Sequence, residues 1–124
     1  MATATTVARW LVRVSGLVLL VLGTLFWTGN ATGLIPLHRL LGFVLVLSLW
    51  TLAALAARAG VARGPVWLAV AWGVVVPLVG LTQDQLLVGS AHWLIRVLHL
   101  LLGLGAIGQA ERLAILTERR LQPA

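Results

Sequence analysis

The sequence predicts an all-α integral membrane protein, an up-down bundle of four helices. Two observations predict this class. Of the 124 residues, 60% are hydrophobic and only 10% are charged, whereas soluble domains carry about 25% charged residues. A chain of this size cannot cover so much apolar surface within one soluble core. Four apolar runs also follow one another, each near the roughly 20 residues that a helix needs to cross a bilayer.

The four predicted spans belong to one domain, residues 1–124, and turn-forming residues separate them. Their bounds are about 7–27, 34–57, 65–82 and 91–114. The intervening segments "TGNATG", "ARAGVARGP" and "TQDQLLVGS" contain the glycine, proline and polar residues that are typical of turns. Pro36 suits the first turn of the second span, and Ser90 is expected to cap the fourth.

Arginine placement predicts the orientation of the bundle. All nine basic residues are arginine. Seven of them lie at the start of span one, between spans two and three, or towards the end of span four: Arg9, Arg13, Arg58, Arg63, Arg112, Arg119 and Arg120. These regions share one side of the membrane if the chain crosses it four times. Both termini are therefore expected in the cytoplasm, and the protein in the cytoplasmic (inner) membrane.

The first span resembles a signal peptide, because arginines precede its apolar run. No small-residue cleavage site follows that run, so we expect the span to be uncleaved. The formal charge of +6 does not indicate a nucleic-acid partner, because the arginines lie at the ends of apolar runs. The expected partner is a lipid bilayer with anionic headgroups. A homo-oligomer and a larger membrane complex both remain open.

Several function classes lack support in the sequence. Without cysteine the chain forms no disulfide, thiolate metal site or covalently attached c-type haem. No paired carboxylate, phosphate loop or Ser/His/Asp grouping indicates a hydrolase or a transferase, so an enzyme is not expected. The segment "GLGAIG", 103–108, has the spacing of a dinucleotide-binding motif. It lies inside an apolar helix rather than after a strand, so we interpret it as a helix-packing surface.

Histidines and arginines inside the apolar runs are the candidate functional residues. In "SAHWLIRVLHLLLG", the residues His92, Arg96, His99 and Gly103 follow the spacing i, i+4, i+7, i+11 and share one helix face. An arginine within a span costs roughly 2.5–3.5 kcal/mol on insertion scales, so such residues are functional candidates by default.

A weak two-helix tandem repeat relates the second and fourth spans. The segments "LHRLLG", 37–42, and "LHLLLG", 98–103, align on His38 and His99, each with a glycine four residues later. Spans two and four run in the same direction and are diagonal neighbours in an up-down bundle. The two histidines can then face each other across the bundle axis.

This combination predicts one b-type haem between spans two and four. A neutral imidazole is a good axial ligand for haem iron. Gly42 and Gly103, one turn from the histidines, remove side chains that would strike a flat macrocycle. Arg39 and Arg96, near the outer side, suit the haem propionates.

The two histidine segments resemble the membrane b-type cytochromes of the cytochrome b561 group. The resemblance implies a four-helix core that holds haem between histidines on separate helices, and thus electron transfer or haem handling. A two-haem member would need four histidines, and this chain has three, so at most one bis-histidine haem is expected.

The sequence does not determine which histidine is the second ligand beside His38. The repeat favours His99, whereas Trp93, expected at the membrane interface, favours His92 at the level of His38; we take His99 as the ligand and His92 as the alternative. Two other functions also remain open. One is a structural or accessory subunit without a cofactor, and the other is a protein that binds a quinone, a pigment or a lipid.

Overall fold

The fold is described by a computed structural model that covers all 124 residues and contains only helical elements and their connections. The long helices are α1 (Ala2–Trp27), α2 (Ile35–Arg58), α3 (Arg63–Thr82) and α4 (His92–Leu121). Short 3₁₀ turns, η1 (Thr32–Leu34) and η2 (Gln83–Gln85), precede α2 and follow α3. The all-α class is confirmed, and all four helices are long and apolar enough to cross a membrane.

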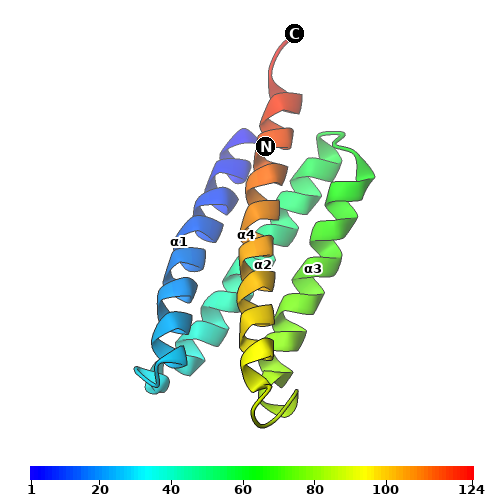
Figure 1. The fold of residues 1–124 in the computed structure, drawn as a ribbon. Helices are drawn as coiled ribbons and strands as arrows, with labels where there is room; N and C mark the ends of the chain where they lie inside the picture. The colour runs from blue at the N-terminus through cyan, green and yellow to red at the C-terminus, as the bar shows by residue number, and fades with distance from the viewer.

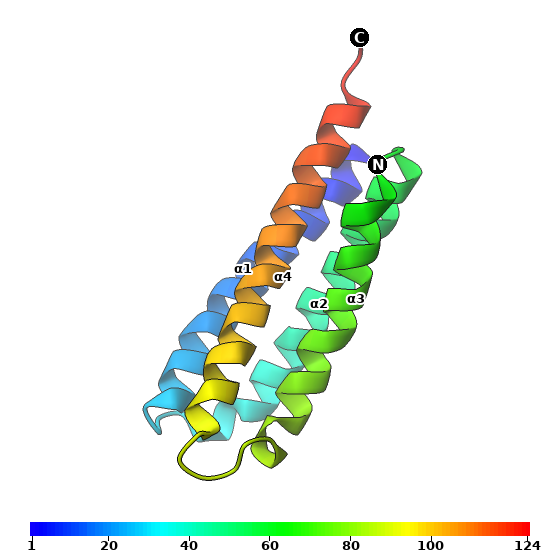
Figure 2. The same cartoon turned by 45° about the vertical axis from the view of Figure 1, so that its right-hand side comes forward.

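Both ends of the chain lie at the same end of the bundle, together with the α2–α3 connection (Figure 1). We call this the terminal end. The opposite end carries the connections 28–34 and 83–91, and we call it the loop end (Figures 1 and 2). Each helix packs against the next, α4 packs against α1, and α2 also packs against α4, whereas no Cα atoms of α1 and α3 approach within 8 Å. The helices α2 and α4 are therefore the inner pair.

Two helices extend beyond the predicted spans. Helix α1 begins at Ala2 and α4 continues to Leu121. The sequence prediction followed the apolar runs, whereas both helices continue into polar residues, and Glu118 in the extension of α4 forms an ion pair with Arg9. Pro36 lies in the first turn of α2, as predicted. The prediction for Ser90 is wrong, because the N-cap of α4 is Ala91 and no side chain caps this helix.

Glycines on the helix faces accommodate large side chains from neighbouring helices. The Trp50 indole lies against Gly73, and its Nε1–H donates to a carbonyl oxygen of α3 at 3.2 Å. The Trp72 indole lies against Gly105, and its Nε1–H donates to a carbonyl oxygen of α4 at 2.8 Å. An indole N–H in hydrocarbon needs such a partner. The "GLGAIG" segment thus serves helix packing through Gly105, inside α4.

The core is concentrated in the terminal half of the bundle. Its largest fully buried side chains are Val12, Leu49, Leu52 and Leu113, with Thr5 and Thr117. In the loop half, no residue from 23 to 44 is buried, and from 77 to 101 only Ile95 is. We call these parts the packed half and the open half. The helices bury most of the core side chains in the packed half and few in the open half.

Candidate functional site

His38 and His99 lie beside each other in the open half. His38 is in the first turn of α2 and His99 is in the second turn of α4. Their ring centroids are 6.3 Å apart, and the ring planes are inclined by 54°. His92 lies elsewhere, where its Nδ1–H donates to the carbonyl oxygen of Leu86 at 3.1 Å. The structure thus brings together the two histidines of the tandem repeat and leaves the third outside.

Each of the paired imidazoles lies over a glycine of the preceding helix. A Cβ atom added at Gly23 would lie 3.7 Å from Cε1 of His38, and one added at Gly80 would lie 2.8 Å from Cε1 of His99. Phe26 packs edge-on against the His38 ring at a centroid distance of 5.3 Å. Each helix pair therefore places a histidine against a glycine, but only the His99 ring lies too close to its glycine to leave space for a Cβ atom.

Sequence reasoning did not assign Gly23 and Gly80 to the site. A signal was present, because Gly16 and Gly23 are seven residues apart, as are Gly73 and Gly80. Residues at this spacing share a helix face. The sequence did not reveal that His38 packs against Gly23 and that His99 packs against Gly80.

The Nδ1 atoms of His38 and His99 are buried and have no hydrogen-bond partner. A buried polar atom without a partner costs about 1–3 kcal/mol, and native structures contain few of them. In particular, Nδ1 of His99 forms no hydrogen bond with a neighbouring helix. Two unpaired imidazoles side by side are a suitable donor set for a metal or for a ligand with polar hydrogen.

The geometry of this pair fits a group bound between two imidazoles. A metal–imidazole nitrogen bond is about 2.0–2.1 Å for zinc, and half an imidazole adds about 1 Å, so ligands on opposite sides of one ion have centroids roughly 6 Å apart. The observed centroid distance is 6.3 Å. Gly42 and Gly103 lie one turn further along their helices, and a Cβ atom added at either would meet nothing within 4 Å. The separation of the two rings is therefore that of two imidazole ligands of one metal ion, and the glycines beside them add no side chain.

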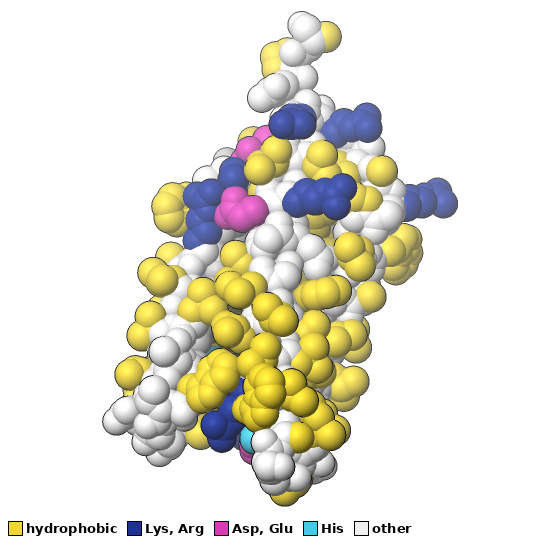
Figure 3. Space-filling view, in the orientation of Figure 1, with side chains coloured by type: hydrophobic (Ala, Val, Ile, Leu, Met, Phe, Trp, Pro, Cys, Tyr) yellow, Lys and Arg dark blue, Asp and Glu magenta, His cyan; other side chains and the backbone are white.

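Charged side chains surround the loop end of this site. Figure 3 shows arginine, histidine and acidic side chains together in a recess at the loop end, between α1 and α4. The arginines of this end are Arg39 and Arg96, and its acid is Asp84. All three are exposed, and none takes part in an ion pair. Both guanidinium groups are therefore free to bind an acidic ligand.

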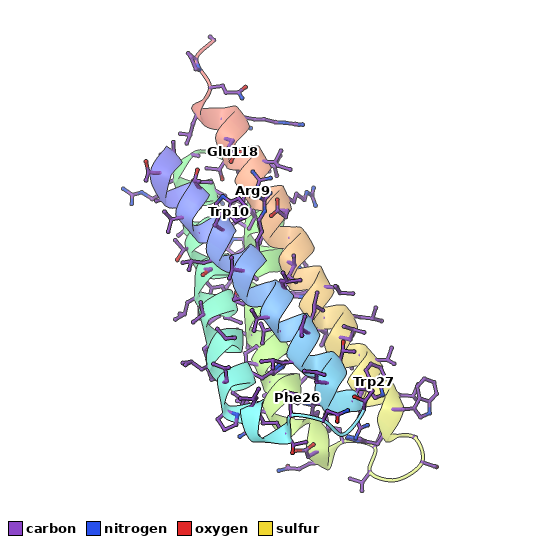
Figure 4. The ribbon with its side chains drawn as sticks, turned by 90° about the vertical axis from the view of Figure 1, so that its left-hand side faces the viewer. Arg9, Trp10, Phe26, Trp27 and Glu118 are labelled. Carbon is purple, nitrogen blue, oxygen red and sulfur yellow. The ribbon has the colours of Figure 1, made fainter.

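A second polar cluster joins α1 to α4 at the terminal end. Arg9 lies 2.7 Å from a Glu111 oxygen and 3.1 Å from a Glu118 oxygen, and Arg13 lies 2.6 Å from the other Glu111 oxygen. Figure 4 shows Arg9 and Glu118 at this end, beside Trp10. The side chains of Arg9 and Glu111 are only 19% and 27% exposed. Sequence reasoning missed this cluster because it used these arginines only to set the orientation.

No protein-family model matches the chain, and neither the curated proteins nor the solved structures contain a match. The resemblance to the cytochrome b561 group therefore depends on the two histidine segments alone.

Proposed function

We propose that this chain is a cytoplasmic-membrane protein that binds one haem b between α2 and α4, where His38 and His99 would hold the group. The observation that carries the proposal is the pair itself. Two imidazoles, each with a buried and unpartnered nitrogen, lie 6.3 Å apart in the half of the bundle that has almost no core.

The proposed orientation places the terminal end in the cytoplasm and the haem near the outer face. Seven of the nine arginines lie in the terminal part of the bundle, which suits the cytoplasmic side. Exposed tryptophans suit the two interfaces, with Trp10 and Trp67 at the terminal end and Trp27 and Trp93 at the loop end. Large exposed hydrophobic side chains between these levels suit contact with lipid (Figure 3).

Each residue of the site has a distinct proposed role. His38 and His99 would hold the iron through their imidazoles, and Gly80 would fix the orientation of the His99 ring by letting it rest on the backbone. Gly42 and Gly103 leave space beside them. Haem b, when bound, supplies a one-electron couple, which makes electron transfer or haem handling the proposed activity.

The two exposed arginines complete the proposed site. Arg39 follows His38 directly, and Arg96 lies three residues before His99 on the same helix. A guanidinium group binds a carboxylate through two parallel hydrogen bonds. These two groups would therefore hold the acidic edge of the ligand towards the outer face, where water is near.

The test is the absorption spectrum of protein purified in mild detergent from haem-replete cells. We expect a low-spin bis-imidazole spectrum that His38→Ala and His99→Ala each abolish, while His92→Ala, the matched control, leaves it intact. Loss of the spectrum in His92→Ala with retention in His99→Ala would make His92 the ligand.

A colourless protein that takes up no added haem would exclude the proposal. Extraction and analysis of small molecules from the same preparation then separates the two alternatives. A bound quinone, pigment or lipid would indicate a carrier of that compound, and an empty extract would indicate a structural subunit.

A further inference from the structure

An open groove runs between α1 and α2 at the terminal end, away from the histidine pair. It is lined by Ala4, Val7, Ala8 and Leu11 of α1 and by Ser48 and Thr51 of α2. The hydroxyl groups of Ser48 and Thr51 donate to carbonyl oxygens of their own helix, at 2.7 and 2.8 Å. Met1 and Thr3 complete the lining, in which five of the eight residues are hydrophobic. The groove is therefore mainly apolar, which suits a hydrocarbon chain.

Arg58 lies level with the terminal end of this groove. Gly16 faces Leu45, and Gly23 faces His38, so the numbers of facing residues in these antiparallel helices add up to 61. By this register Arg58 lies opposite Thr3, which also lines the groove. Arg58 follows Thr51 by seven residues, which places both on one face of α2.

The positive charge of Arg58 has no acidic partner within the chain. Arg58 is exposed and forms no ion pair. The two acids at the terminal end are Glu111 and Glu118, and both are held by arginines of α1. An anion at Arg58 must therefore come from outside the protein.

We propose that this groove binds one anionic phospholipid, with an acyl chain along α1 and α2 and the phosphate at Arg58. An apolar groove that leads to an uncompensated cation matches a molecule with an acyl chain below an anionic headgroup. The cytoplasmic leaflet, at the proposed level of Arg58, carries such lipids. This inference depends on the membrane placement and is independent of the haem.

The test measures lipid retained by the full chain after delipidation in detergent and incubation with dioleoyl phosphatidylglycerol or dioleoyl phosphatidylcholine. Native mass spectrometry should show one tightly retained phosphatidylglycerol per protein and little phosphatidylcholine. Arg58→Gln should weaken phosphatidylglycerol retention about fivefold, the effect of one arginine near an anionic surface. Arg120→Gln removes an exposed arginine away from the groove and should leave retention within about twofold of the unmodified chain.

A second pair of variants tests the groove rather than the charge. Ala4→Trp fills the groove and should displace the lipid, whereas Ala2→Trp adds the same bulk on another face of α1 and should not. Both positions are exposed, so neither change disturbs the core. Equal retention of the two lipids, equal effects of Arg58→Gln and Arg120→Gln, or full retention by Ala4→Trp would each overturn the proposal.

Discussion

Replacing Gly80 by alanine tests whether this glycine positions His99. The added Cβ atom would lie 2.8 Å from Cε1 of His99, whereas ordinary contacts begin at 3.4 Å, so the ring must move by about 0.6 Å or the helices must separate. Overpacking of this kind costs about 1–3 kcal/mol. Alanine also gains about 1 kcal/mol over glycine within a helix.

Gly103→Ala is the matched control, because a Cβ atom added at Gly103 meets nothing within 4 Å. In both variants the change from glycine to alanine within a helix stabilises the protein by about 1 kcal/mol. This contribution cancels when the free energies of unfolding of the two variants are compared. The haem-free Gly80→Ala protein should therefore be less stable than Gly103→Ala by about 1–3 kcal/mol. Unfolding in SDS, followed by far-ultraviolet circular dichroism, measures the difference.

The same variants have a spectroscopic readout. Ligands of a functional site must be held within about 0.5 Å of their productive positions, and the required shift of His99 exceeds this. Gly80→Ala should therefore weaken the low-spin haem spectrum. Equal stability of the two alanine variants, together with an unchanged spectrum of Gly80→Ala, would refute the argument that the glycine sets the position of the imidazole.

Four further predictions follow from the ion pairs, the open half and the orientation. Glu111→Gln should lower the free energy of unfolding, because Arg9 and Arg13 lose their shared carboxylate partner. We expect a loss of about 1–3 kcal/mol, between the values for exposed and for buried ion pairs, and SDS unfolding measures it. Gly103→Leu should abolish haem uptake, measured by absorbance on haem titration, without reducing insertion, since no neighbour lies within 4 Å. Arg96→Leu should speed transfer of haem to apomyoglobin without changing the absorption maximum; an unchanged rate would remove Arg96 from the site. Alkaline phosphatase should be inactive when fused at Ala124 and active when inserted at Gly89, and the reverse would overturn the orientation.

The helical class and the approximate positions of the helices were predictable because both depend on composition and on apolar run length. Helix ends were less predictable. Helix α4 extends to Leu121, and its polar last turns are held to α1 by side-chain ion pairs. The sequence provides both the acids and the arginines but does not show that they meet, because Arg9 and Glu118 are 109 residues apart in the chain.

The histidine pair was predictable as a hypothesis because the repeat aligned His38 with His99. The glycines that contact these histidines were harder to predict. The glycine stripes of the first and third spans are visible in the sequence, but which side chain each glycine receives depends on the rotation of the facing helix. The uneven core was also not predictable, because which apolar side chains become buried depends on how closely the helices approach each other at each level.

The ion pairs between α1 and α4 have a consequence for how the chain is assembled during synthesis. Arg9 and Arg13 emerge from the ribosome first, while their carboxylate partners lie 98 to 109 residues later. In the proposed orientation, these arginines have no acidic partner while the first three helices are inserted, and they act as positive charges that retain the N-terminus in the cytoplasm. Pairing with Glu111 and Glu118 becomes available only when the fourth helix enters the membrane. A chain interrupted before that point keeps two arginines without their acidic partners and lacks the ion pairs that join α1 to α4.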